Sequence, residues 1–298
     1  MQAALLPDRG VVKVAGDDAR RLLNGLITND VGKVAPGKPR FAALLTPQGK
    51  IIADFIVAEV EPSEGGGLFL DCPRALAPAL VEKLNFYKLR AKVIVEDLSA
   101  VLGVMAIWDG AKDSDYGLSY ADPRLPALGT RVMLPPHLAA DATGELGATL
   151  TDAEAYETHR IALGIPRGGQ DFSYGDTFPH EADMDQLGGV DFEKGCYVGQ
   201  EVVSRVEHRA SARSRIVPIS YEFAPISGLP VTAGERQIGI VGSIAKGRGL
   251  AMLRLDRLAD ALASHTPLTA GGIAVKAMKP AWAHFDFPGD AADPKAAT

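Results

Sequence analysis

Residues 194–201 read KGCYVGQE, and this octapeptide carries more chemical information than any other stretch of the chain. It places a thiol, Cys196, between a cation, Lys194, and an amide–carboxylate pair, Gln200 and Glu201. Its two glycines permit backbone angles that other residues avoid, and they let a ligand approach the main chain. Three valines follow at helical spacing, so we expect the motif to lead into a helix.

Cys196 has two interpretations on chemistry alone. A thiol just before a helix N-terminus feels the positive end of the helix dipole, which favours the reactive thiolate. A lone cysteine is equally often a small buried hydrophobic residue. Chemistry favours neither interpretation, so both stay open at this point.

The composition is that of an ordinary soluble globular protein, with 298 residues, 47% hydrophobic and 23% charged. No apolar run approaches the ~20 residues that span a bilayer, so we expect no membrane contact. The net charge of −6 excludes a general binder of polyanions. Two cysteines and six histidines show no metal-ligand spacing, so we expect no permanently bound metal. Free thiols and a first segment without signal or transit character favour a bacterial cytoplasmic protein.

Hydrophobic periodicity predicts three domains and a tail. Residues 1–100 follow the order strand, helix, strands, helix, strand, which is typical of a ferredoxin-like sheet. Residues 101–210 form a second α+β lobe that carries KGCYVGQE. Residues 211–287 consist of short strands with glycine-rich turns, which predicts a small β-barrel. Residues 288–298 are small and polar, so we expect a disordered tail.

A long segment rich in Gly, Asp and Pro, residues 166–190, leads directly into the motif. Loops of this length without regular structure are usually functional or disordered. Because this loop ends at KGCYVGQE, we favour a functional role.

The octapeptide resembles the signature of the YgfZ family, whose mitochondrial relatives serve iron–sulfur protein maturation. These proteins are similar to the T-protein of the glycine cleavage system, a folate-dependent aminomethyltransferase. Weaker matches occur in the family order along nearly the whole chain. They are LNGLITNDV at 23–31, LLTPQGKIIADFIV at 44–57, FYKLRAKVIVED at 86–97, and Asp122-Pro123-Arg124 with Gly129-Thr130-Arg131.

The resemblance implies an α+β fold, in which two ferredoxin-like lobes and a C-terminal β-barrel form a three-domain ring around a folate pocket. It implies a tetrahydrofolate-binding protein that supports iron–sulfur cluster assembly or repair and, through it, tRNA modification. The implied partners are folate and iron–sulfur proteins or their assembly machinery, and we do not expect direct binding of tRNA. The alternative is a folate-dependent aminomethyltransferase.

Asp54 bears on that choice. The T-protein has a pair of carboxylates in its hairpin strand, where this chain has Ala53 and Asp54, so we expect an accessory factor rather than an aminomethyltransferase. Asp54 interrupts an apolar run, and burying a carboxylate without a partner costs several kcal/mol. The N–H groups of a pterin ring would satisfy it. The plainer alternative is a half-exposed strand in which Asp54 faces water.

Three further residues are candidates for contact with folate. Glu181 is a candidate to orient the pterin or, alternatively, to accept local backbone N–H groups. Tyr87 either stacks on the ligand ring or belongs to the core. Arg205 lies in a basic run and either binds the carboxylates of the folate tail or is part of a solvated face. RNA is disfavoured because no aromatic residues are interleaved. The run comprises Arg205, His208, Arg209, Arg213 and Arg215.

Within the motif, we expect Cys196 to act as nucleophile, transient cluster ligand or redox partner, and the sequence does not choose among these roles. We expect Lys194 and Glu201 to position the loop by ion pairing. The motif residues proposed for the site are Lys194, Gly195, Cys196, Tyr197, Gly199, Gln200 and Glu201.

Overall fold

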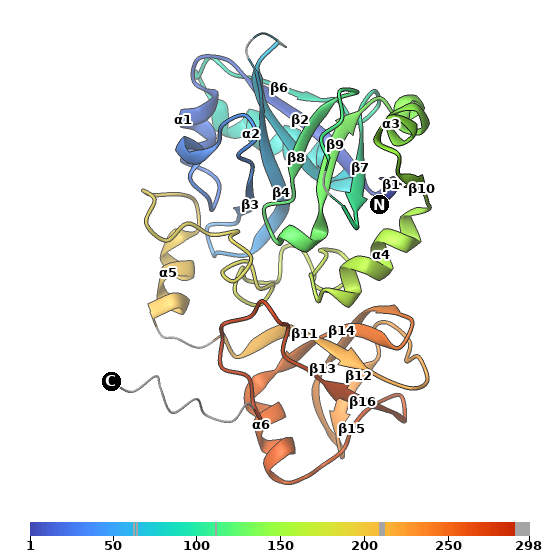
Figure 1. The fold of residues 1–298 in the computed structure, drawn as a ribbon. Helices are drawn as coiled ribbons and strands as arrows, with labels where there is room; N and C mark the ends of the chain where they lie inside the picture. The colour runs from blue at the N-terminus through green and yellow to red at the C-terminus, as the bar shows by residue number, and fades with distance from the viewer. Residues whose placement is uncertain (62, 64, 111, 209–211, 290–298) are drawn as a thin grey trace, which may run out of the picture.

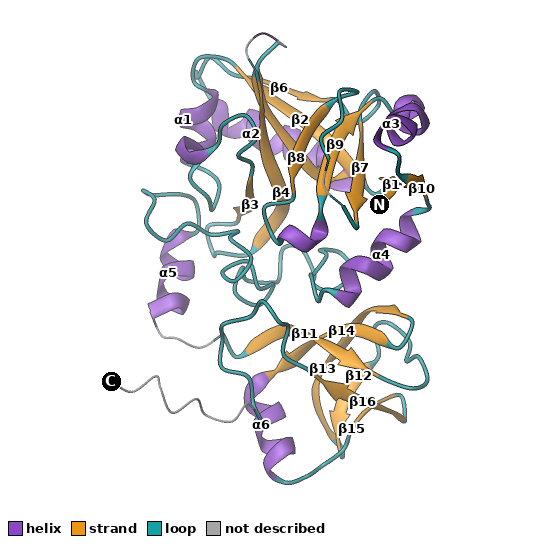
Figure 2. Cartoon of the chain, viewed as in Figure 1, coloured by secondary structure: helices purple, strands orange, loops and turns teal. Residues whose placement is uncertain are grey.

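The computed structural model describes residues 1–298 except 62, 64, 111, 209–211 and 290–298. The described residues form two five-stranded sheets and a closed β-barrel of six strands. Figure 1 shows the two sheets side by side in the upper body of the molecule, with the barrel below them. Helices flank the sheets, and long loops fill the region between sheets and barrel (Figure 2). The expected α+β fold with a C-terminal barrel is confirmed.

The first sheet runs in the order β3-β4-β5-β2-β6. Successive side chains of a strand point to opposite faces of the sheet, and β4 buries apolar side chains on both faces. Ala53, Phe55 and Val57 pack in the cluster that includes residues of α1 and α2, whereas Ile56 and Ala58 join the core shared with the second sheet. The elements are β2 (Arg9–Ala15), α1 (Ala19–Asn24), β3 (Arg40–Leu45), β4 (Ile51–Val60), β5 (Gly67–Pro73), α2 (Ala77–Lys88) and β6 (Ile94–Asp97), with short 3-10 helices at Val31–Lys33 and Arg74–Leu76.

The second sheet runs in the order β10-β1-β7-β9-β8 and includes the start of the chain. β1 (Gln2–Leu6) pairs antiparallel with β7 and parallel with β10, so the first residues belong to this sheet. The first sheet therefore does not include the whole of the predicted domain 1–100, because β1 belongs to the second sheet. The other elements are β7 (Gly103–Trp108), β8 (Leu118–Ala121), β9 (Thr130–Leu134), α3 (Ala139–Leu146), β10 (Thr149–Leu150), α4 (Ala153–Ala162) and α5 (Gln200–His208), with 3-10 helices at Pro126–Leu128 and Pro136–Leu138.

The barrel closes in the order β11-β14-β13-β12-β15-β16 and has its own hydrophobic core. It packs against α4, where Arg160 donates a hydrogen bond to Ser243 of β13 at 2.7 Å, and Trp282, after the last barrel strand, donates to the carbonyl of Leu163 at 2.8 Å. The tail predicted at 288–298 lies outside the described residues from position 290 onward. The elements are β11 (Ser214–Ser220), β12 (Pro230–Ala233), β13 (Arg236–Ala245), β14 (Arg248–Arg254), α6 (Leu255–Ala263), β15 (Leu268–Ala270) and β16 (Ile273–Ala277).

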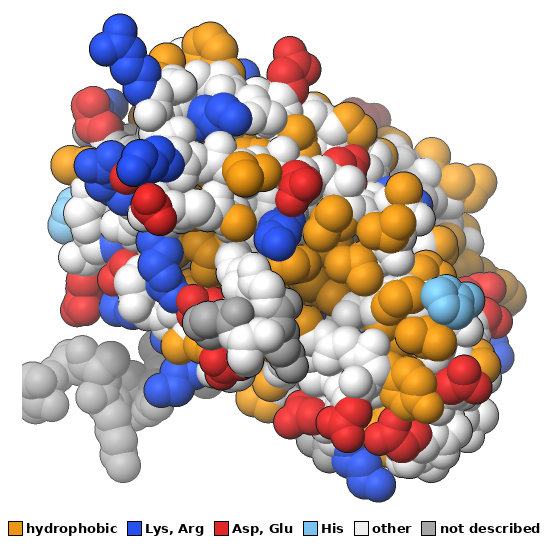
Figure 3. Space-filling model, turned by 90° about the horizontal axis from the view of Figure 1, so that it is seen from above, with side chains coloured by type: hydrophobic (Ala, Val, Ile, Leu, Met, Phe, Trp, Pro, Cys, Tyr) orange, Lys and Arg blue, Asp and Glu red, His pale blue; other side chains and the backbone are white. Residues whose placement is uncertain are grey.

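The surface above the sheets is uneven in character. Seen from above in Figure 3, hydrophobic side chains gather in a hollow near the centre, and Lys and Arg side chains are more frequent on the left. The left of that view is the side on which α1 lies in Figure 1. Over the part of the chain that the structure describes, no helix is long and apolar enough to cross a membrane.

Candidate functional site

Lys194 fastens the KGCYVGQE loop to the first lobe. Its buried ammonium group donates hydrogen bonds to the carbonyl oxygens of Asn24, Ile27 and Asn29, at 2.7, 2.7 and 3.0 Å. These carbonyls lie at the end of α1 and just beyond it. Burial lowers the pKa of Lys194 to about 8, against the opposing effect of two nearby carboxylates. The side chain is therefore predominantly charged at neutral pH and has three N–H donors for three acceptors.

The expected ion pair between Lys194 and Glu201 is wrong. Lys194 points into the protein and binds backbone carbonyls, whereas Glu201 lies in the first turn of α5 and faces solvent. Glu201 instead pairs with Arg205 one helical turn later, at 2.7 Å. Both partners are exposed, so this pair contributes little to stability.

Two glycines let the motif pack directly on the β3–β4 turn. Gly199 has a φ of +83°, and a Cβ atom there would lie 2.6 Å from the carbonyl oxygen of Thr46. Gly49, in the turn itself, has a φ of +81°, and its Cβ would meet the side chain of Val202 at 3.0 Å. Glycine meets both the backbone and the spacing requirement at each position. The hairpin and the motif therefore form one packed unit.

Cys196 is exposed at the surface of this fixed loop, next to the exposed Gly195. This excludes the interpretation of Cys196 as a small buried hydrophobic residue. Tyr197 is buried beside it, and burial raises the pKa of its hydroxyl to about 12. The second thiol, Cys72, is buried in β5, and burial raises its pKa to about 12. Of the two thiols, Cys196 alone is available to a partner or reagent.

Asp54 is buried on β4 and already has a hydrogen-bond donor from the protein itself. The hydroxyl of Tyr174, in the long loop before the motif, donates to Asp54 Oδ1 at 2.5 Å. Burial, together with the charge of Asp54, raises the pKa of Tyr174, so this hydroxyl stays protonated. The alternative in which Asp54 faces water is excluded, because Asp54 is only 7% exposed.

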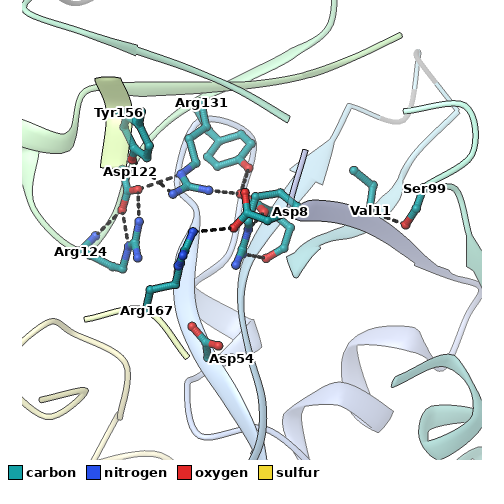
Figure 4. Close-up of polar contacts among 12 residues, drawn as sticks. Asp8, Val11, Asp54, Ser99, Asp122, Arg124, Arg131, Tyr156 and Arg167 are labelled. Carbon is teal, nitrogen blue, oxygen red and sulfur yellow. Dashed lines mark hydrogen bonds and ion pairs between the residues drawn. The ribbon is translucent and has the colours of Figure 1, made fainter. Parts of the chain in front are cut away.

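Close to Asp54, a buried ionic network joins the two sheets (Figure 4). Asp71 on β5 accepts hydrogen bonds from Arg9 and Arg131, both at 2.6 Å, and from the Tyr120 hydroxyl at 3.0 Å. Burial acts to raise the pKa of Asp71, but the charges of the two guanidinium groups outweigh it and lower the pKa. Arg131 also donates to Asp122 at 2.8 Å, so the Asp122-Pro123-Arg124 segment is part of this interface.

Two neighbouring cavities meet at this place. Asp54 lines a narrow one of about 30 Å³. A wider cavity of about 630 Å³ shares Asp8, Arg9 and Arg167 with it and is also lined by Arg74 and Tyr174. In Figure 4, Asp54 lies below Arg167 and apart from the dashed network. The wider volume lies in the range of pockets for small molecules, ~300–1,000 Å³. Tyr174, which lines the wide cavity and bonds Asp54, therefore separates the carboxylate from it.

The other expected folate contacts lie elsewhere in the structure. Glu181 and Arg205 line a third cavity of about 350 Å³ beside α5, and Glu181 accepts the backbone N–H of Phe178 at 3.0 Å. Tyr87 lines a fourth cavity, of about 480 Å³, between the ends of α1 and α2. The four residues named as folate contacts thus line three separate cavities rather than one.

The residues of the basic run do not share one surface in the structure. Arg205 is on the surface of α5, and Arg215 is buried, where it donates to Asp185 at 2.5 Å. Arg209 lies outside the described residues. Close to Arg215, ligand atoms of His180, Asp185 and Glu207 lie within 4.8 Å of one another. Because Arg215 already holds Asp185 and Glu207 is hydrogen-bonded to His180 at 3.0 Å, we interpret this group as an Arg215–Asp185 ion pair beside a hydrogen bond.

Sequence reasoning missed Tyr174, Arg9, Arg167 and Asp71. Asp71 could have been found from the sequence, because an acidic residue inside the strand-like run LFLDC indicates a buried carboxylate that needs a cation as its partner. The three other residues carried no such signal, since their importance comes from the distant segments that they contact.

Two family models match the chain. The GCVT N-terminal domain matches residues 8–108, and the CAF17 C-terminal beta-barrel domain matches residues 213–285. These ranges correspond to the first lobe with β7, and to the barrel.

Curated relatives match over most of this chain. The human protein named iron-sulfur cluster assembly factor IBA57, mitochondrial, is 30% identical over 304 residues, which cover 93% of this chain and 84% of the relative. Homologues from Coccidioides immitis and Mycosarcoma maydis are 30% and 35% identical over 86% and 74% of this chain. The chain spans 72% and 57% of the lengths of these two fungal proteins.

A solved structure shares the fold. The glycine cleavage system aminomethyltransferase T from Bartonella henselae superposes with a TM-score of 0.73 over 96% of this chain and 87% of its own, at 15% identity. The T-protein-like arrangement is therefore confirmed. At this identity the likeness concerns the fold and leaves the activity open.

The relatives correct one expectation. They are named as mitochondrial proteins, so the assignment to a bacterial cytoplasm is wrong. Free thiols indicate only a reducing environment, which is not specific to that compartment. On its match to the human and fungal proteins, the chain belongs to the family of the iron–sulfur cluster assembly factor IBA57 and related T-protein-like proteins with a CAF17-type barrel.

Proposed function

We propose that this protein supports the assembly or repair of iron–sulfur clusters and binds tetrahydrofolate or a derivative. The observation that carries the proposal is the exposed thiol of Cys196, on a loop fixed by Lys194 and by the packing of Gly199. The names of the IBA57 relatives support the cluster role.

Cys196 acts, on this proposal, as a transient ligand of a cluster shared with a partner. A thiolate ligates cluster iron, and one exposed cysteine leaves the remaining ligands to the other chain. An internal disulfide is disfavoured because Cys72 is buried in β5 and the chain has two cysteines in all. Of the three roles expected for the thiol, transient ligation fits this arrangement best.

The wide cavity and Asp54 suit a folate. The wide cavity is mostly apolar and is lined by Arg9, Arg74 and Arg167 together with Asp8, which suits a ligand with an aromatic body and a carboxylate tail. Arg9 pairs with Asp71, Arg167 with Asp8, and Arg74 donates to the carbonyl of Ser99. Because each guanidinium group has five N–H donors, a carboxylate tail would share them with these partners. Asp54 is an acceptor for pterin N–H groups once Tyr174 moves aside. Bound folate would supply one-carbon or redox chemistry, and these residues would bind and orient it.

Aminomethyl transfer is the alternative, and Asp54 is the observation that favours it. Two observations count against it: the position next to Asp54 is Ala53, where the T-protein has a second carboxylate, and the hydroxyl of Tyr174 already donates a hydrogen bond to the Asp54 carboxylate.

The resemblance to the YgfZ family adds to the proposal an effect on tRNA modification, through modifying enzymes that contain iron–sulfur clusters. The net charge of −6 supports an indirect effect rather than contact with RNA.

Calorimetric titration with tetrahydrofolate tests the ligand, and Asp54→Ala tests the pocket. Saturable binding that Asp54→Ala abolishes is the expected result, and no binding by the wild-type protein would remove folate from the proposal. Cys196→Ser tests the cluster role separately. In cells that lack the protein, this variant should fail to restore cluster-dependent enzymes, and full restoration would overturn the proposed role of the thiol.

A further inference from the structure

The cavity between the ends of α1 and α2 is positively charged on a chain that is negative overall. We call it the α1–α2 pocket; its volume is about 480 Å³, and its lining includes Arg21, Leu26, Tyr87, Lys88, Leu89 and Arg90. Among the described residues that line the pocket, the one acid is Asp18, and it is already engaged, because it accepts a hydrogen bond from Arg21 at 3.0 Å and from the backbone N–H of Lys92 at 2.9 Å. Two of the three cations, Lys88 and Arg90, therefore remain in excess over carboxylates of the lining.

Leu89 is an unfavourable residue for stability at its position. It follows α2 with φ 45° and ψ −107°, a conformation that suits glycine and strains a bulky side chain. Its side chain is nevertheless 85% exposed, so burial of apolar surface does not offset the free-energy cost of this strain. Phe86, one turn earlier, is 71% exposed. The strained Leu89 lines the pocket, and the ring of Phe86 contacts that of the lining residue Tyr87, so strain and exposed apolar area beside the pocket point to a contact surface.

The α1–α2 pocket adjoins the loop that carries Cys196. Its lining residues Gly25 and Leu26 lie between Asn24 and Ile27, whose carbonyls hold Lys194. α1 and α5 lie on the same side of the molecule in Figure 1. A molecule seated in the pocket would therefore be a neighbour of the Cys196 loop.

We propose that the α1–α2 pocket docks an acidic segment of a partner protein that carries an exposed apolar side chain. Lys88 and Arg90 pair with its carboxylates, and Leu89 and Tyr87 of the lining cover its apolar residue. The charge of the pocket selects an acidic partner. This surface goes beyond the proposed folate and cluster roles, since neither requires it.

Single-stranded RNA is the competing ligand for a surface with cations and aromatic rings. Phe86 and Tyr87 meet edge to face, with ring centres 5.5 Å apart and planes at 78°. They therefore do not offer parallel faces on which successive bases stack. The exposed aliphatic Leu89 also fits a protein surface better than a row of bases.

Fluorescence polarisation tests the proposal with three labelled probes. The first is a short peptide of Asp and Glu that carries one Phe and one Leu; the second has Ser in place of both; the third is oligouridylate. The wild-type protein should bind the first peptide best. Absence of that preference, or tighter binding of oligouridylate that the same variants weaken, would overturn the proposal.

Leu89→Gly and the double variant Lys88→Glu with Arg90→Glu locate the binding. Each should weaken binding of the first peptide by about tenfold or more. Leu89→Gly relieves the positive φ, so its melting temperature should equal or exceed that of the wild type, and lost binding will not reflect unfolding. Lys246→Glu, on the exposed turn between β13 and β14, is the charge-reversal control and should bind normally. Unchanged affinity in Leu89→Gly would overturn the proposal, and the outcome is independent of the folate titration.

Discussion

The ammonium group of Lys194 donates a hydrogen bond to the carbonyl oxygen of Ile27 over 2.7 Å, although 167 positions separate the two residues in the sequence. Two more carbonyls near the end of α1 share the same ammonium group. Buried carbonyl groups need partners, and one lysine here supplies three. Lys194 of the signature thus stabilises the fold, and by holding the loop in place it also fixes the position of Cys196.

Lys194→Met should lower the free energy of unfolding by about 2–4 kcal/mol. The methionine nearly conserves the apolar stem but leaves three carbonyls without their charged donor. Urea unfolding monitored by circular dichroism measures the change. Lys246→Met, at an exposed position in the barrel, is the matched control and should change stability little. Equal effects of the two substitutions would show that the three bonds do not stabilise the fold.

Cys196 should react with iodoacetamide in the native protein, whereas Cys72 should react only after unfolding. Cys196 is exposed, while Cys72 is buried and burial raises its pKa to about 12, so its thiolate is scarce as well as inaccessible. Mass spectrometry of digested protein gives the extent of labelling at each position. Labelling of both thiols at similar rates in the native protein would contradict the structure.

Tyr174→Phe should bind tetrahydrofolate more tightly than the wild type if Asp54 is the pterin acceptor. The substitution frees the carboxylate and leaves it without a donor, so we also expect a loss of about 1–3 kcal/mol in stability. Tyr221→Phe is the control, because it removes a hydroxyl whose bonds lie within the barrel. Folate affinity that falls in Tyr174→Phe and not in the control would assign the tyrosine to the ligand instead.

Asp71→Asn should destabilise the protein by about 3–5 kcal/mol at neutral pH, because it removes the buried carboxylate that the guanidinium groups of Arg9 and Arg131 share, and among the described residues only Arg131 keeps a second carboxylate, Asp122. The pH dependence has a definite sign. The folded pKa of Asp71 is below its unfolded value of 3.8, so its stabilisation is present above that pH and is lost as the pH falls toward the folded value. The gap between wild type and variant should therefore narrow below about pH 4. A gap that widens on acidification would contradict this assignment.

Strands with long apolar runs could be predicted from the sequence, as β4 and β7 show, because periodicity is a local property. β1 was not predicted: QAALL is short and does not alternate, and its pairing with β7 joins segments about a hundred residues apart. The residues of the candidate site also fall into those that local sequence predicts and those that it does not. The signature and the single carboxylate Asp54 could be found locally, whereas the Tyr174 donor and the carbonyl partners of Lys194 depend on distant segments.

Asp183 should respond to pH in the opposite direction from Asp71. It is fully buried, one of its carboxylate oxygens has no hydrogen-bond partner, and burial raises its pKa well above 3.8 against the charge of Arg215. The folded state therefore binds the proton more tightly than the unfolded state, and the contribution of Asp183 to stability falls as the pH rises above about 4.

Asp183→Asn removes this loss, and asparagine tolerates the φ of 57° at this position. The variant should be at least as stable as the wild type at neutral pH, and its advantage should shrink as the pH falls to about 4. Asp185→Asn is the contrasting control: it weakens a pair that binds Arg215 through two bonds of 2.5 and 2.8 Å, so it should destabilise the protein. Thermal melts of the three proteins across this pH range measure both effects. Equal destabilisation by the two asparagines at neutral pH would mean that Asp183 is charged and paired in the folded state.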